Sequence, residues 1–153
     1  MSRKIIMSAT PIVLAAGAAV LLLLGCVEVS RISDDHVEPV DYEKMVRLIE
    51  KPKKPAVLVD VRQPKQFDQG HIPGAINIPI NKLNYGDIRL AQAVNIIVYS
   101  ASVSDMLSRA AAKTLLRLEY QNVYDYRGGL AEWQANHRAI EGEAGTNAEA
   151  NGQ

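Results

Sequence analysis

The clearest candidate for chemistry in this sequence is a serine at the junction between a predicted strand and a predicted helix. The apolar run from Ile96 to Tyr99 is bounded by Asn95 and Ser100, which predicts a buried strand over Asn95–Tyr99. Apolar residues at helical spacing then predict a helix over Asp105–Leu118. Backbone N–H groups and the helix dipole converge on such a loop, so it is suited to bind an anion. Ser100 opens the loop, and neither a cysteine nor a cationic residue occurs in it before Arg109.

A hydrolytic role for Ser100 would require a histidine base and an acid that orients it. The chain has three histidines. His71 lies in a turn with glycine and proline, where a structural role is expected, His36 lies in a predicted tether, and His137 lies near the end of a predicted helix. No two histidines have the spacing of a zinc site. The sequence therefore favours neither a serine hydrolase nor a metal site, and we expect no cofactor.

Two other pairs of residues are expected to support a pocket at the same edge of the sheet. Asp60 and Arg62 end a predicted buried strand over residues 56–62. A catalytic role is conceivable, but a buried aspartate bound by loop N–H groups and paired with the arginine is the preferred interpretation. Gly128 and Gly129 are expected to let the backbone pass close to the central loop and to start the last helix.

The lysine-rich segment of residues 51–55 has two interpretations. Lys51, Lys53 and Lys54 alternate with two prolines. Clustered lysines are compatible with a phosphate site, but prolines hold a chain extended, so a solvated loop is the preferred interpretation.

The elements that position these residues alternate between strands and helices. Strands are predicted over residues 56–62, 75–78, 95–99 and 122–126. Helices are predicted from about Pro39, with Asp41 as the N-cap, from Pro64, over 105–118 and over 130–137. Residues 80–93 are predicted to be a loop with a short helix, and residues 139–153 a disordered tail. This alternation predicts an α/β fold with a parallel sheet covered on both faces.

The amino terminus has the features of an export signal. Arg3 and Lys4 precede a long uncharged run that ends in Leu-Leu-Gly before Cys26. The segment resembles a bacterial lipoprotein signal, which implies a signal peptide over residues 1–25, a lipid on Cys26, and a polar tether over 26–36. The alternative is an uncleaved helical anchor, because the run is long enough to span a bilayer. Both alternatives place the domain outside the cytoplasm, bound to a membrane of the cell envelope and facing the periplasm in a Gram-negative cell.

Loss of such a signal would change both the thiol content and the charge. Cys26 is the only cysteine, so with a lipid on it the folded domain would have no thiol. Removing residues 1–25 takes two of the 17 basic residues and none of the 17 acidic ones, which leaves 15 − 17 = −2. Nothing in the sequence forms a nucleic-acid-binding patch, so the expected partners are the membrane and an envelope protein.

Four blocks of the sequence resemble a single rhodanese domain. They are Asp60-Val61-Arg62, the segment Gly70–Pro79 (GHIPGAINIP) after Phe67, the strand ending at Tyr99, and Gly128-Gly129 with Trp133. The match covers about residues 37–138. The resemblance implies a three-layer α/β domain with a five-stranded parallel sheet and helices on both faces. It also implies that the active-site loop follows the central strand.

The loop departs from the pattern that the resemblance implies. Active rhodanese domains look like Val-Tyr-Cys-Arg-x-Gly-x-Arg-Ser here, and their cysteine takes up sulfane sulfur as a persulfide. The loop of this chain is Ser100, Ala101, Ser102, Val103, Ser104 and Asp105, followed by Met106. By position, serine replaces the cysteine, valine the glycine and aspartate the second arginine. A hydroxyl forms no persulfide, a carboxylate repels an anionic donor, and a β-branched residue is unsuited to a positive φ.

Two functional hypotheses follow. The first is a tethered binding or scaffold module whose pocket has lost sulfur chemistry, with no catalytic residue. The second is an atypical sulfurtransferase of the rhodanese family, which would depend on a thiol of a partner. The residues favour the first hypothesis, while the fold alone would favour the second.

Overall fold

A computed structural model describes residues 37–143 of the chain. The predicted signal peptide, Cys26 and the tether lie outside the described residues, as do residues 144–153. Within the described range no helix is long and apolar enough to cross a membrane.

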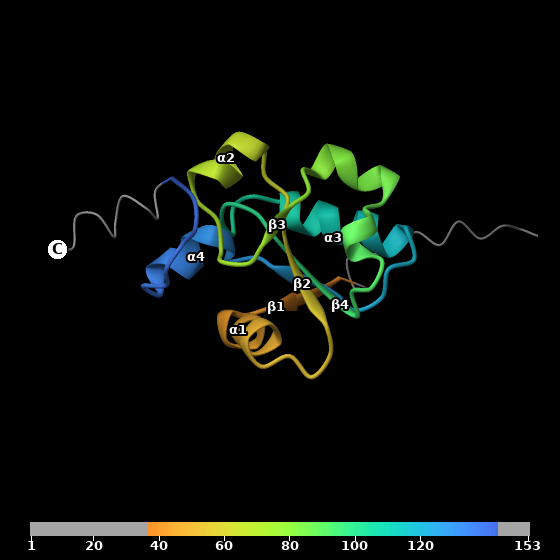
Figure 1. The fold of residues 1–153 in the computed structure, drawn as a ribbon, viewed down its shortest axis with the longest axis horizontal. Coiled ribbons are helices and arrows are strands. Elements are labelled where there is room, and N and C mark those ends of the chain that lie inside the picture. The colour runs from red at the N-terminus through yellow and green to blue at the C-terminus, as the bar shows by residue number, and fades with distance from the viewer. Residues whose placement is uncertain (1–36, 144–153) are drawn as a thin grey trace, which may run out of the picture. The chain divides into compact units, whose positions relative to one another are not determined.

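The centre of the domain is one parallel sheet of five strands in the order β1-β5-β4-β2-β3. The strands are β1 (Glu38–Val40), β2 (Ala56–Asp60), β3 (Ile76–Asn77), β4 (Asn95–Tyr99) and β5 (Val123–Tyr126). Strand β4 lies in the middle, between β5 and β2. The predicted α/β class and the parallel sheet are therefore confirmed (Figure 1).

Helices cover both faces of the sheet (Figure 1). The α-helices are α1 (Tyr42–Glu50), α2 (Pro64–Gln69), α3 (Leu107–Arg117) and α4 (Gly129–Ala135), and the 3-10 helices are η2 (Ile80–Tyr85) and η3 (Ile88–Leu90). One face packs against α3, η2 and η3, and the other packs against α1 and α4. The three predicted layers are thus present.

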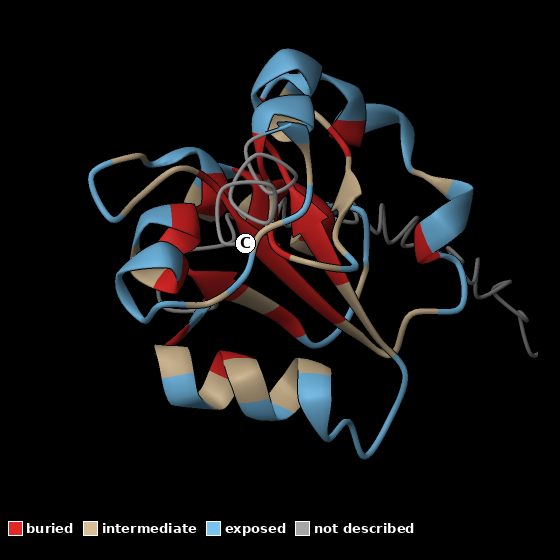
Figure 2. Cartoon of the chain, turned by 60° about the vertical axis from the view of Figure 1, so that its left-hand side comes forward, coloured by how far each residue is buried: buried red, intermediate tan, exposed pale blue. Residues whose placement is uncertain are grey.

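Alternation along the strands builds a separate core on each face. In β4, Ile96 and Val98 belong to the core under α3, while Ile97 and Tyr99 belong to the core under α1 and α4. All four side chains are fully buried. A strand covered on both faces reads as a continuous apolar run, which is why this segment could be recognised from sequence. Figure 2 shows the sheet as the most buried part of the domain.

Strand β1 is the one strand that the residue pattern did not predict. Residues 38–40 were expected to lead into a helix, but they pair with β5, with Glu38 opposite Tyr124. The helix begins only at Tyr42, after Asp41, whose side chain accepts a hydrogen bond from the Lys44 backbone at 2.7 Å. An edge strand of three residues with a proline has too little pattern to be recognised.

The ordered domain continues beyond the boundary predicted at Arg138. The Trp133 indole donates a hydrogen bond to the Ala139 carbonyl at 2.7 Å. Glu141 and His71 exchange backbone hydrogen bonds of 2.8 and 2.9 Å. Residues 139–143 thus close the carboxyl end of the described fold, although the sequence pattern placed them in the predicted tail.

Candidate functional site

The loop that follows β4 lies at the carboxyl edge of the sheet, where ligands bind in open α/β folds. Ser100 is fully buried, and its hydroxyl donates a weak hydrogen bond to the Asp105 carbonyl at 3.4 Å. The backbone N–H groups of Leu130 and Ala131 donate to the carbonyls of Ser100 and Ala101 at 3.0 and 2.9 Å. Hydrogen bonds thus hold the serine inside the loop, and no histidine is among its partners within residues 37–143. This arrangement provides no general base for a serine nucleophile.

Asp105 lies just ahead of α3, which begins at Leu107. One carboxylate oxygen accepts a hydrogen bond from the Leu107 backbone N–H at 2.9 Å. A helix amino terminus attracts negative charge because its first N–H groups are free and the helix dipole is positive there. The protein therefore supplies its own anion at the point where an anionic substrate would bind.

The middle of the loop projects into solvent. Val103 and Met106 are 71% and 62% exposed. The Ser102 and Ser104 hydroxyls hydrogen-bond to each other at 2.9 Å. Val103 does not have a positive φ, so the loop follows a path that a β-branched residue tolerates. The exposed part of this loop combines apolar side chains with serine hydroxyls, and residues 100–106 include no cation.

Gly129 allows the start of α4 to lie against the loop. Its φ is +61°, and a Cβ on it would lie 2.5 Å from the Ser100 carbonyl oxygen. Gly128 precedes it with an ordinary helical φ of −58°. The close approach expected of this glycine pair therefore occurs at Gly129.

Asp60 and Arg62 form a buried ion pair beside the loop. The guanidinium donates to both carboxylate oxygens, with a shortest distance of 2.6 Å, and also to the Gly70 carbonyl at 2.7 Å. The Arg62 backbone N–H donates to Asp60 at 2.9 Å. Burial acts to lower the pKa of Arg62, but hydrogen bonding and charge from Asp60 raise it overall. Every strong contact of the pair is internal, so its geometry is that of a structural clamp.

Asp125 is a buried carboxylate that the residue pattern did not single out. It is fully buried in β5, and its Oδ2 accepts a hydrogen bond from Arg127 Nε at 3.3 Å. Burial raises the pKa of Asp125, and the Ser108 side chain and the charge of Arg109 partly offset this effect. Alternation along β5 could have shown that Asp125 shares the face of Val123 under α3.

His71 has a structural environment. Its ring stacks on Phe67 with centroids 3.7 Å apart, and its Nδ1 lies 2.9 Å from the Phe67 carbonyl oxygen. His137 lies just after α4, and His36 falls outside the described residues. Residues 37–143 contain no cluster of three or more potential metal ligands.

Comparison with known proteins agrees with this fold. Residues 41–136 match the family described as rhodanese-like domain. The putative mitochondrial thiosulfate sulfurtransferase of Schizosaccharomyces pombe is 32% identical over 113 residues, which cover 64% of this chain and 78% of that protein. The thiosulfate sulfurtransferase GlpE of Pseudoalteromonas translucida is 26% identical over 83 residues, covering 54% of this chain and 77% of that protein.

A solved structure gives the same result. The crystal structure of the BH2092 protein of Bacillus halodurans superposes with a TM-score of 0.63 at 26% identity, covering 73% of this chain and 82% of that one. The sheet order, the loop after the central strand and these matches together show that the chain belongs to the rhodanese-like domain family and is related to thiosulfate sulfurtransferases.

Proposed function

We propose that this protein is a catalytically inactive rhodanese-like domain, tethered to a membrane of the bacterial envelope, that acts as a binding or scaffold module. The observation that carries the proposal is the loop after β4. A buried serine opens the loop, and the Asp105 carboxylate accepts a hydrogen bond from the backbone N–H of Leu107, the first residue of α3.

Sulfane sulfur transfer requires a group that this domain lacks. The sulfur acceptor in such chemistry is a thiolate, which attacks the donor and retains one sulfur as a persulfide. The only cysteine of the chain is Cys26, ahead of the described domain. Ser100 has neither the acidity nor the polarisability of a thiol, and no base activates it. The Asp105 charge further opposes the approach of thiosulfate.

The outer face of the same loop favours binding over catalysis. Val103, Met106 and Leu107 are 71%, 62% and 37% exposed, and they follow one another along the loop and the start of α3. Apolar side chains that reach solvent together mark interaction surfaces more often than catalytic ones. An envelope protein is the partner class that fits a tethered domain with such a surface.

The decisive test of inactivity is a thiosulfate:cyanide sulfurtransferase assay. We expect the chain that begins at Val27 to form no more thiocyanate than a heat-denatured sample does. An active single-domain relative, assayed under the same conditions, is the positive control. Thiocyanate production clearly above the denatured control would refute the proposal.

The tether is tested separately through Cys26. A diacylated cysteine anchors a protein firmly, because two chains suffice where one is marginal. We expect Cys26→Ala to block processing at this site and to remove the lipid from the chain. Wild-type processing and fractionation of the variant would refute lipidation, while retention of the variant through an uncleaved helix would support the anchor alternative.

A second candidate function is an atypical sulfurtransferase that borrows a thiol from a partner. The names of the related proteins from S. pombe and P. translucida favour it. It predicts a cysteine-bearing protein that copurifies with the chain and becomes persulfidated only in its presence. A purification from envelope membranes followed by persulfide labelling distinguishes the two functions.

A further inference from the structure

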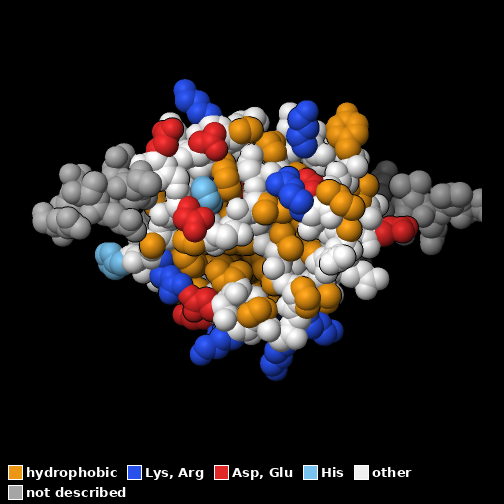
Figure 3. Space-filling view, viewed as in Figure 1, with side chains coloured by type: hydrophobic (Ala, Val, Ile, Leu, Met, Phe, Trp, Pro, Cys, Tyr) orange, Lys and Arg blue, Asp and Glu red, His pale blue; other side chains and the backbone are white. Residues whose placement is uncertain are grey.

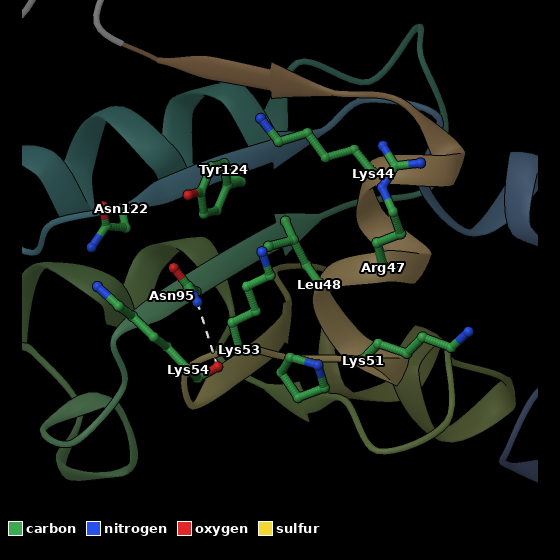
Figure 4. Close-up of a pocket in the computed structure, with 10 residues that line it drawn as sticks. Lys44, Arg47, Leu48, Lys51, Lys53, Lys54, Asn95, Asn122 and Tyr124 are labelled. Carbon is green, nitrogen blue, oxygen red and sulfur yellow. Dashed lines mark hydrogen bonds between the residues drawn. The ribbon is translucent and has the colours of Figure 1, made fainter.

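A pocket of about 620 Å³ lies at the edge of the sheet opposite the Ser100 loop (Figure 4). It is formed by α1, the loop that follows α1, and the residues at the amino ends of β4 and β5. Its lining residues are Lys44, Arg47, Leu48, Lys51, Pro52, Lys53, Lys54, Asn95, Asn122 and Tyr124. We call it the basic pocket, because five of these ten residues are cationic and none is acidic. Its volume is within the range of small-molecule sites.

Most of the positive charge of the basic pocket is uncompensated. Lys44 forms an ion pair with Glu38. Within the described part of the chain, no carboxylate lies within ion-pair distance of Arg47, Lys51, Lys53 or Lys54. The carbonyl end of α1 contributes only about half a negative charge. An anion that entered the pocket would therefore relieve repulsion among the cations.

The pocket also has fixed polar and apolar parts. The Asn122 amide donates to the Val94 carbonyl at 3.0 Å, and the Lys44 ammonium lies 5.3 Å from the centre of the Tyr124 ring. In Figure 4 the Lys53 and Lys54 side chains extend toward the ends of β4 and β5, while Lys51 points away from them. The basic pocket thus combines flexible cationic side chains with the apolar surface of Leu48 and Tyr124. Such a lining suits a phosphate that carries a less polar group.

The described part of the chain begins at the edge of the sheet that carries this pocket. All five strands are parallel, so the amino end of β1 lies at the same edge as the amino ends of β4 and β5. Glu38 in β1 is opposite Tyr124, which lines the pocket. From Cys26 to Val37 the chain can span at most ~40 Å. Figure 3 shows Lys and Arg side chains along the lower edge, where Figure 1 shows α1 and the loop after it.

We propose that the basic pocket binds the phosphate headgroup of an anionic membrane lipid and so holds the amino edge of the sheet against the bilayer. The inference rests on the proposed membrane tether, which brings this edge close to the lipid surface. Anionic bilayers attract such clusters, and each lysine near the surface strengthens the attraction about fivefold. The headgroup, rather than free phosphate, is the occupant because the tether fixes its high local concentration.

The test uses the full chain in lipid nanodiscs that contain either phosphatidylcholine alone or phosphatidylcholine with phosphatidylglycerol. Brief acetylation followed by mass spectrometry reports the accessibility of each lysine. We expect acetylation of Lys53 and Lys54 to slow about fivefold or more in the anionic discs. Lys65 and Lys82, which are exposed and follow the carboxyl ends of β2 and β3, serve as internal controls and should not change.

A pair of charge-reversal variants tests the pocket itself. In Lys53→Glu the protection of Lys54 should disappear, whereas in Lys65→Glu/Lys82→Glu it should remain. Equal acetylation in both kinds of disc, or equal slowing of all lysines, would overturn the proposal. Protection in neutral discs by added glycerol phosphate or inorganic phosphate at millimolar concentration would overturn the assignment to lipid.

The same experiment separates this inference from the tether. A chain that stays with neutral discs but shows no protection in anionic discs has a tether and no lipid site, which refutes the inference alone. A chain that leaves neutral discs but binds anionic discs through Lys53 and Lys54 refutes the tether and supports the pocket. In the supporting case 1 M salt should abolish the protection, because it shortens the Debye length to ~3 Å.

Discussion

Restoring the thiol alone should not restore sulfur chemistry. In a Ser100→Cys variant of the chain that begins at Val27, the new side chain is the only thiol present. It would be buried like Ser100 and would lie in the same loop as Asp105, whose backbone carbonyl is the hydrogen-bond acceptor of Ser100. Burial raises a thiol pKa, and a neighbouring carboxylate raises it further. We therefore expect the thiol pKa of this variant to lie above the usual value of about 8.5.

The Asp105 charge sets the size of the effect. At an effective dielectric constant of about 20, two negative charges repel by ~4 kcal/mol at 4 Å and by ~2 kcal/mol at 8 Å. The start of α3 would offset ~0.3–1 kcal/mol of this, but the Asp105 carboxylate already binds the Leu107 N–H there. Adding Asp105→Asn should thus lower the thiol pKa by about 1.5 to 3, since each pKa unit is worth about 1.4 kcal/mol.

The Asp105→Asn substitution removes the negative charge at position 105 while it keeps the shape of the side chain. The asparagine amide oxygen can still accept the hydrogen bond from the Leu107 N–H, so this contact is kept while the charge is lost. The pH dependence of alkylation by iodoacetamide gives each thiol pKa, and intact-mass spectrometry after exposure to thiosulfate detects a persulfide as one added sulfur. Full sulfurtransferase activity is expected only with Asp105→Arg and Val103→Gly added to the cysteine.

Two results would refute this reasoning. One is robust persulfide formation by the Ser100→Cys single variant, which would mean that the loop binds the anionic donor in spite of Asp105. The other is an equal thiol pKa in the single variant and in the variant with Asp105→Asn, which would mean that the carboxylate does not act on the residue at position 100.

Three further predictions concern stability, measured by urea denaturation. Gly129→Ala should lower the free energy of unfolding by roughly 3 kcal/mol, because its Cβ would clash with the Ser100 carbonyl in addition to the ~1–2 kcal/mol that a left-handed conformation costs. Gly74→Ala, with a φ of +74° and nothing within 4 Å of its Cβ, should lose only the ~1–2 kcal/mol of the left-handed conformation, and equal losses in the two variants would contradict the packing argument. A chain that stops after Arg138 should lose about 1–3 kcal/mol relative to one that stops after Glu143, because the Trp133 indole loses its acceptor; equal stability would show that residues 139–143 contribute nothing. Asp125→Asn should leave the free energy of unfolding unchanged below pH 4 and should increase it progressively above pH 4, because burial raises the pKa of Asp125 in the folded protein and ionisation of the carboxylate therefore destabilises the wild type as the pH rises. A constant difference between variant and wild type from pH 4 to 8 would contradict this.

The parts of the fold that could be predicted are those with redundant local signals. Strand β4 is apolar from Ile96 to Tyr99 because both its faces are buried there, and Asp41 marks the start of α1 by its capping side chain. Strand β1 has three residues, one of them a proline, and its existence depends on pairing with β5. A short edge strand stabilised by a distant partner has no periodicity of its own, so the sequence pattern could not reveal it.

The candidate site shows the same division between local and long-range information. The composition of the loop already indicated that Ser100 could not accept sulfur and that Asp105 would oppose an anion. The hydrogen bond from the Leu107 N–H to Asp105 depends on where α3 begins, and it begins two residues later than predicted. The basic pocket was beyond prediction, because its lysines were interpreted as a solvated loop and its floor comes from two distant strands.

The parallel sheet gives the two edges of the domain different surroundings. Every strand starts at the edge with the basic pocket and ends at the edge with the Ser100 loop. If cations hold the amino edge against lipid, the carboxyl edge must face away from the bilayer, since the two edges are opposite ends of the same strands. Val103 and Met106 would then be presented to the aqueous side, where a protein partner can reach them. Under the proposals of a tether and of an inactive loop, the edge with the Ser100 loop is thus the surface best placed for binding, and its orientation follows from strand direction.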